Sequence, residues 1–113
     1  MSTSNGALPR IVVTGLGAVT PLGLDVESTW QGLLAGKRVV DRITKFDATD
    51  FLTQIGAEIT DFDFGPYEEW LSPKEARRSD PNMLYAVAAT AQAMEHAAIR
   101  VQSNEEGDRY GNI

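Results

Sequence analysis

Cysteine is absent from the 113-residue chain, and histidine occurs once, as His96. The lack of cysteine excludes disulfides, thiolate catalysis and thiolate metal sites within this sequence. A lone histidine with no second ligand at metal-binding spacing does not predict a metal centre. His96 also follows Glu95 directly, and side chains adjacent in sequence do not face each other on a helix. We therefore expect no metal ligands and no catalytic pair here.

Basic charge and long apolar runs are also scarce. The 10 Lys and Arg residues are outnumbered by 16 Asp and Glu residues, so the net charge is −6. This balance disfavours binding to nucleic acid or to an anionic membrane. No apolar run approaches the roughly 20 residues that a membrane span needs, and the amino terminus does not resemble a secretory signal. We expect a cytoplasmic globular protein with a flexible tail over residues 1–9.

The stretch RIVVTGLGAVTPLG (residues 10–23) organises the rest of the chain. Its valines and isoleucine predict a buried strand over residues 11–14, and Gly15 and Gly17 allow a turn or a close approach of the backbone. A dinucleotide-binding fingerprint would need a third glycine that opens directly into a helix. Thr20 stands at that position and a proline delays the helix, so the pattern favours a structural turn and no cofactor.

Capping residues predict three helices. The first runs from an N-cap at Asp25 to Gly36, which ends it. The second begins at Ser72, where Pro73 and Glu75 complete a capping box. The third and longest spans residues 81–99. Its many alanines favour helix and allow close packing, so we expect it to lie between other elements.

Other segments give weaker signals. Residues 39–53 are expected to form a loop, and the alternation of apolar residues over residues 54–59 predicts a half-exposed strand. Tyr67 and Trp70 are expected to fold back over the core. After a polar loop at residues 102–108, residues 109–113 are expected to begin another strand.

Lys74, Arg77 and Arg78 lie at i, i+3 and i+4 on one helical turn and so share a face. A concentrated basic patch on an acidic chain can steer an acidic partner to one place. The alternative is a solvated face whose charge Glu75 and Asp80 partly neutralise. Spacing alone leaves both interpretations open.

A series of stretches together resembles a known family in its order and spacing. They are RIVVTGLGAVTPLG (10–23), VESTWQGLLAGK (26–37), ITKFDATDF (43–51), LSPKEARRSD (71–80) and AMEHAAI (93–99). The series resembles the amino-terminal part of a β-ketoacyl-acyl carrier protein synthase, of the synthase II type, and covers nearly all of the chain from Arg10 onward. Polyketide ketosynthases and their non-catalytic partner subunits share much of it.

The resemblance implies an α/β, thiolase-like fold with αβαβα layers, usually as a homodimer. Residues 10–113 would form the start of its first half. The implied activity is an acyl transfer of fatty-acid elongation, in which an acyl thioester undergoes decarboxylating Claisen condensation with malonyl carrier protein. The family's nucleophilic cysteine, two histidines and lysine would lie downstream. We therefore expect this segment to be truncated before the catalytic residues and inactive alone, with no cofactor.

The resemblance also implies a role for the basic residues, because they match basic positions of the family. In the family, the basic residues of the stretch matching SPKEARRSD help to dock the acidic acyl carrier protein, and Lys74, Arg77 and Arg78 match them. The sequence departs from the family where Pro81, Asn82 and Met83 replace the usual aromatic start of the next helix. Two alternatives remain at this point: a non-catalytic chain-length subunit of a polyketide synthase, and an independent small domain that binds a protein partner.

Overall fold

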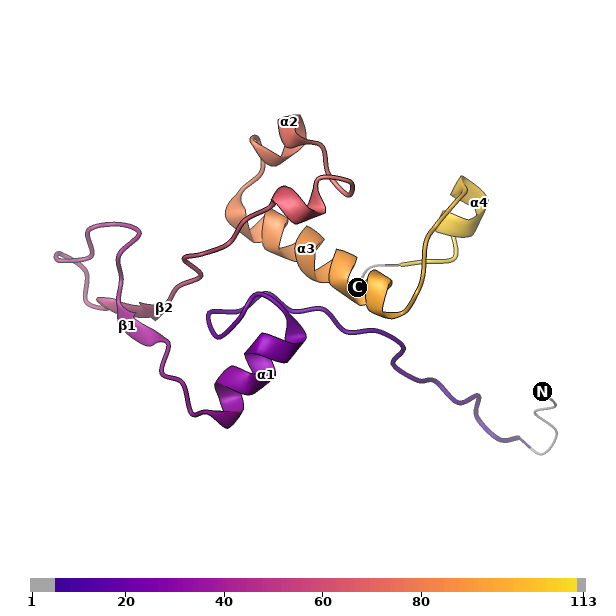
Figure 1. Cartoon of the computed structure of the whole chain (residues 1–113), viewed down its shortest axis with the longest axis horizontal. Helices are drawn as coiled ribbons and strands as arrows, with labels where there is room; N and C mark the ends of the chain where they lie inside the picture. Colours follow the sequence, from indigo (N-terminus) through magenta and orange to yellow (C-terminus); the bar gives the residue numbers. More distant parts are fainter. Residues whose placement is uncertain (1–5, 112–113) are drawn as a thin grey trace.

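The computed structural model describes residues 6–111, which are arranged around one long helix, α3 (Pro81–His96) (Figure 1). Alanine has the highest helix propensity, and Pro81 occupies the first helical turn, where its missing N–H leaves no bond unmade. Ala88 and Ala91 on this helix are fully buried. The predicted position between other elements is therefore confirmed.

The helix ends before residue 99, where the sequence had placed its end. Ala98 adopts a left-handed conformation with φ 55°. Its amide and that of Ile99 donate to the carbonyls of Glu95 and Met94. This is the Schellman arrangement that stops a helix, formed here without the usual glycine.

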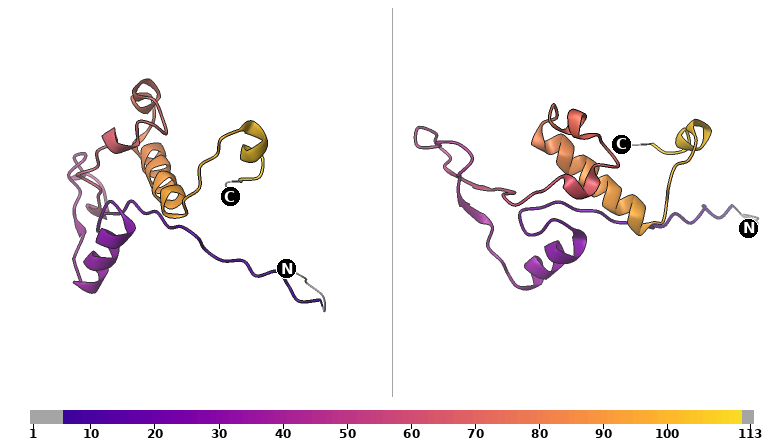
Figure 2. Two further views of the ribbon diagram at one scale, coloured as in Figure 1. Left: turned by 45° about the vertical axis from the view of Figure 1, so that its right-hand side comes forward. Right: turned by 45° about the horizontal axis from the view of Figure 1, so that its top comes forward.

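Residues 14–18, which we call the glycine segment, run alongside α3 in the opposite direction (Figures 1 and 2). The amide of Leu16 donates to His96 Nδ1, and the amide of Ala18 donates to Gln92 Oε1, both at 3.1 Å. Side chains of α3 thus accept two backbone amides of a segment that has no sheet partner within residues 6–111.

The strand predicted over residues 11–14 is not formed. The chain there is extended but unpaired, and Ile11 and Val13 are 92% and 78% exposed. Valine and isoleucine favour strand geometry only where a neighbouring strand supplies hydrogen bonds and a packing surface. The part of the chain that the structure describes offers residues 11–14 no such neighbour.

Helix α1 (Val26–Leu34) confirms the first predicted helix. Asp25 caps it by accepting from the amide of Ser28 at 2.7 Å, and the Ser28 hydroxyl oxygen accepts from the amide of Asp25. Gly36 ends the helix with a positive φ of 62°, the left-handed geometry that glycine adopts without steric cost.

The predicted loop at residues 39–53 contains a strand, β1 (Val40–Arg42), which pairs antiparallel with β2 (Ile55–Ala57) in the register Val40↔Ala57. The prediction of β2 is confirmed, but that of an uninterrupted loop is wrong. Mixed charged and apolar residues at 40–42 gave no alternation, and the strand forms because β2 supplies its hydrogen bonds. The intervening residues project away from α3 (Figure 1).

Between β2 and α3 lie a short 3-10 helix, η1 (Gly65–Tyr67), and α2 (Pro73–Ala76). Tyr67 packs beside α3 in an aromatic group in which the Phe62 ring meets the Tyr85 ring edge-on at 4.9 Å. Tyr67 therefore folds back over the core as predicted, and Trp70 is also partly buried.

Beyond α3 the chain turns into α4 (Asn104–Gly107), which Ser103 caps by accepting from the amide of Glu106. The polar loop predicted at residues 102–108 is thus largely helical. Residues 109–111 form no strand. The remainder of that predicted strand, residues 112 and 113, lies outside the described residues.

The chain combines helices and strands, as an α/β protein should, but is far from compact. Its radius of gyration is 18.7 Å, against about 13 Å for a globular domain of this length. Its accessible surface is 9338 Å², against about 6100 Å² for a compact monomer of this mass. Within residues 6–111 the only sheet is two-stranded, so this part of the chain does not display the expected αβαβα layers.

Candidate functional site

The three basic residues predicted to form a patch lie at α2, and we call them the basic turn: Lys74, Arg77 and Arg78. The capping box that the sequence predicts is present, because Ser72 Oγ accepts from the amide of Glu75 and donates to Glu75 Oε2 at 2.6 Å. This box fixes the helical turn that carries Lys74, and Arg77 lies three residues further along the same turn. The structure thus brings the three predicted residues together on one short turn.

The side chains of the basic turn are exposed. Among the described residues none of the three forms an ion pair, and the one hydrogen bond runs from Arg77 Nε to the carbonyl of Pro73 at 3.2 Å. Glu75, which could have neutralised them, is engaged with Ser72 instead. The positive charge is therefore directed to solvent, where an acidic partner could reach it.

The loop that carries the basic turn is anchored on α3. Just before it, Tyr67 Oη accepts from Gln92 Nε2 at 2.9 Å. The same amide group donates to the carbonyl of Leu24 at 2.8 Å, and its oxygen accepts from Ala18. Gln92 therefore links the glycine segment, the start of α1 and the base of the loop.

Sequence reasoning missed Gln92 because a single glutamine in a helix is ordinarily a surface residue. The available signal was its position inside an alanine-rich stretch that was expected to be buried. A polar side chain at such a position needs hydrogen-bond partners, since burial without them costs free energy. The three segments that Gln92 joins are the partners that meet this need.

The glycines of the glycine segment serve packing. A Cβ at Gly15 would collide with the carbonyl oxygen of Ala93, and one at Gly17 with that of Ala89. The amides of Leu16 and Ala18, which a phosphate-binding turn would offer to a ligand, are already donated to α3. The close approach predicted from these glycines is therefore confirmed.

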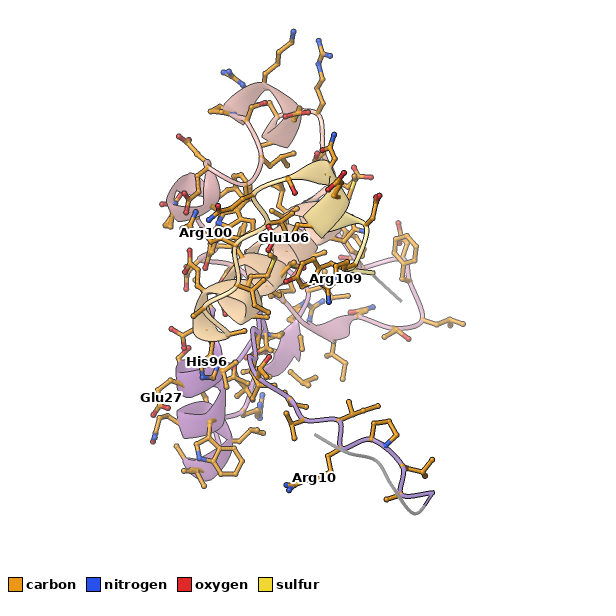
Figure 3. The ribbon with its side chains drawn as sticks, turned by 90° about the vertical axis from the view of Figure 1, so that its right-hand side faces the viewer. Arg10, Glu27, His96, Arg100, Glu106 and Arg109 are labelled. Carbon is orange, nitrogen blue, oxygen red and sulfur yellow. The ribbon has the colours of Figure 1, made fainter. Side chains whose placement is uncertain are left out.

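His96 accepts the amide of Leu16 near the end of α3 (Figure 3), so its observed contact is structural. Within residues 6–111 no group of three or more histidines and carboxylates is placed to hold a metal ion. Across the same residues, no helix combines the length and apolar character needed to cross a membrane.

Hydrogen bonds lower the pKa of three carboxyl groups, and all three lie away from the basic turn. The Ser28 hydroxyl and amide lower the pKa of Asp25, and the corresponding groups of Thr49 lower that of Asp47. The amide of Lys45, followed by the Thr44 hydroxyl, lowers the pKa of Glu58. Each carboxylate caps local backbone, so these shifts mark structural positions.

Comparison with known proteins identifies the family of this chain. The family model described as "Beta-ketoacyl synthase, N-terminal domain" matches residues 9–113. The chain belongs to the β-ketoacyl synthase family. The resemblance seen in the sequence is thereby confirmed, because the matched residues include the glycine segment, α1, the basic turn and α3.

Three similar relatives carry the name 3-oxoacyl-[acyl-carrier-protein] synthase 2. The chain is 43% identical to the protein of Synechocystis sp. over 80% of its own length and 21% of the relative's. It is 45% identical to that of Coxiella burnetii over 81% and 22%, and 35% identical to that of Staphylococcus aureus over 90% and 24%. This β-ketoacyl synthase chain thus spans between a fifth and a quarter of the length of these relatives.

Proposed function

We propose that the chain is the amino-terminal segment of a β-ketoacyl-acyl carrier protein synthase that elongates fatty acids. The family match over residues 9–113 carries the proposal, and the names of the three relatives support the acyl carrier protein as the partner. The same names favour the catalytic protein over a non-catalytic chain-length subunit. They also favour it over an independent binding domain.

The proposed reaction joins an acyl group to a malonyl-derived unit with loss of carbon dioxide. Such a condensation needs a nucleophile to hold the acyl group and donors to stabilise the oxyanion. The chain contains no cysteine, so the nucleophile expected for the family is not among these residues. In this proposal the 113 residues supply scaffold and docking, and have no condensing activity alone.

The proposed docking site is the basic turn: Lys74, Arg77 and Arg78. Its support is the exposure of all three side chains and the absence of any ion pair to them within residues 6–111. Exposed like charges held together on one turn attract an acidic partner over about one Debye length, roughly 10 Å at 0.1 M salt. On a chain of net charge −6, this concentration of positive charge would also orient that partner.

Reversal of the charge on the basic turn tests the proposal. We expect the variant K74E/R77E/R78E of the full-length protein to bind an acidic acyl carrier protein at least about tenfold more weakly at low ionic strength. Repulsion then replaces attraction at the contact itself. Isothermal titration calorimetry or fluorescence anisotropy with labelled carrier measures the affinity.

A matched control carries the same change in net charge at a different place. The variant K37E/R38E/R42E alters three exposed basic residues near the end of α1 and in β1. It should retain most of the affinity, because its local contacts, Arg38 with Asp41 and Arg42 with Gln54, lie outside the basic turn. Its effect on the carrier would then come through the overall field of the protein alone. Equal losses in the two variants, or no loss in the first, would contradict docking at the basic turn.

A further inference from the structure

Three residues form a cluster at the base of the loop that carries the basic turn: Glu69, Trp70 and Arg100. The Arg100 guanidinium approaches Glu69 with both terminal nitrogens, Nη2 to Oε1 at 3.4 Å and Nη1 to Oε2 at 3.5 Å. Its central carbon lies 5.9 Å from the centre of the Trp70 ring. One arginine thus contacts two consecutive residues of the loop, through a two-pronged ion pair and a cation–π contact.

The Trp70 ring lies against this guanidinium. Its indole Nε1 is buried and has no hydrogen-bond partner among the described residues. A ring without such a bond is held by packing and by the guanidinium beside it. Its neighbours around a shallow cavity are Met94 of α3 and Val101. Removal of Arg100 would therefore leave the ring with packing alone.

Arg100 reaches the loop because of how α3 ends. The left-handed Ala98 turns the chain sharply, and Arg100 follows two residues later. Figure 3 shows it between α2, at the top of that view, and His96 below. The contact therefore joins the carboxyl-terminal end of α3 to a loop that enters the same helix at its other end.

The basic turn lies between two points of attachment. On one side is the cluster at residues 69 and 70, and on the other is the start of α3 at Pro81. The loop between these points makes few contacts of its own beyond the capping box at Ser72. The orientation of the basic turn must therefore depend on how firmly both points are held.

We infer that Arg100 is a positioning residue for carrier binding, which holds the base of the loop so that the basic turn faces the partner. This inference rests on the proposed docking function. Arg100 acts through Glu69 and Trp70 and needs no contact with the carrier. Its own charge is opposed at close range by Glu69, so it adds little to the attraction that the basic turn exerts.

Two substitutions separate positioning from direct contact. Arg100→Lys keeps the charge but loses the planar fork that pairs with Glu69 and stacks on Trp70. If Arg100 positions the loop, this variant should bind the carrier about threefold to tenfold more weakly. If Arg100 attracted the carrier directly, Lys would replace it and the affinity would not change.

For Glu69→Gln, positioning and direct attraction predict changes in carrier affinity of opposite sign. Removing this carboxylate breaks the ion pair, so positioning predicts weaker binding. Direct attraction predicts tighter binding, because an opposing negative charge has been removed. Glu68→Gln, which removes the adjacent exposed carboxylate, is the matched control and should bind no more weakly than the unaltered protein.

Amide hydrogen exchange in the full-length protein supplies a readout of position. We expect Arg100→Lys and Glu69→Gln to speed exchange over residues 70–79 and leave α1 unchanged. Weaker carrier binding in both variants, with faster exchange in the loop, supports the inference. Unchanged binding in Arg100→Lys, or tighter binding in Glu69→Gln, overturns it. The triple reversal K74E/R77E/R78E is measured alongside, because its failure to weaken binding would refute the docking function itself.

Discussion

At the residue scale, the contact between the glycine segment and α3 decides the architecture. Gly15 and Gly17 lie so close to α3 that its backbone carbonyls occupy the space of a Cβ. A side chain could be accommodated only by moving the backbone, since neither partner atom belongs to a flexible side chain. The glycines are thus required by packing, although the sequence pattern also invited a ligand-binding interpretation.

Gly17→Ala tests this contact. We expect a loss of about 1–3 kcal/mol in the free energy of unfolding, the usual cost of overpacking. Hydrogen exchange should also rise at the amides of Leu16 and Ala18, which the glycine segment donates to α3. Thermal unfolding and exchange measure the two effects.

Gly111→Ala is the control for this substitution. Nothing lies within 4 Å of a Cβ built at Gly111, and Gly111 is not among the glycines with positive φ. It should therefore change stability very little. If Gly17→Ala proved as mild as the control, the glycine segment could not be packed against α3 as described.

At the element scale, capping residues predicted more than apolar patterns did. Asp25 and Ser72 each start a helix where the sequence placed it, because a cap depends on neighbours a few residues away. The strand predicted at residues 11–14 failed, since strand formation depends on partners distant in sequence. The basic turn could be predicted because, like α2, it depends on residues that are close together in the sequence. Its anchors, Gln92 and Arg100, could not, because they act across the fold.

The pairing of β1 with β2 should depend on pH through Glu58. Its carboxylate accepts from the Thr44 hydroxyl at 2.8 Å and from the amides of Thr44 and Lys45. These bonds favour the ionised form and hold the pKa below its ordinary value of 4.5. Their contribution is therefore present above about pH 4.5 and is lost as the pH falls towards the lowered pKa.

Hydrogen exchange over residues 40–57, corrected for its intrinsic pH dependence, measures this effect. Protection should decline as the pH is lowered from 5 to 3, and Glu58→Gln should show low protection throughout. Glu68→Gln, at an exposed carboxylate that accepts no hydrogen bond from the described part of the chain, should retain the decline. A decline of the same size in Glu58→Gln would show that another group is responsible.

At the scale of the whole molecule, the exposed apolar surface is the main feature. Only Ala48, Ala88 and Ala91 are buried apolar residues in the described chain. Large apolar side chains are exposed in three separate parts of the chain: Ile11 in the unpaired stretch before the glycine segment, Trp30 on α1 and Phe51 in the loop between β1 and β2. Where such side chains lie together in one large patch, they ordinarily mark an interaction surface. Sequence alone could not predict this exposure, because periodicity identifies an apolar face without showing what covers it.

We propose that a second copy of the protein buries part of this exposed apolar surface, in line with the homodimer that the family resemblance implies. We expect multi-angle light scattering of the full-length protein to give twice the mass of one chain. A single-chain mass at micromolar concentration would contradict the homodimer. It would leave the family membership and the carrier-docking proposal intact.

The most direct test of carrier docking is a charge exchange between the two proteins. Lys74, Arg77 and Arg78 are changed to Glu, and the acidic residues on the carrier's docking surface are changed to Lys. Affinity is then measured for all four pairings at low ionic strength. We predict weak binding when either protein alone is changed and recovery when both are, because attraction is restored with its direction reversed. Failure of the doubly changed pair to recover, with both proteins folded, would contradict a direct contact between the basic turn and the carrier.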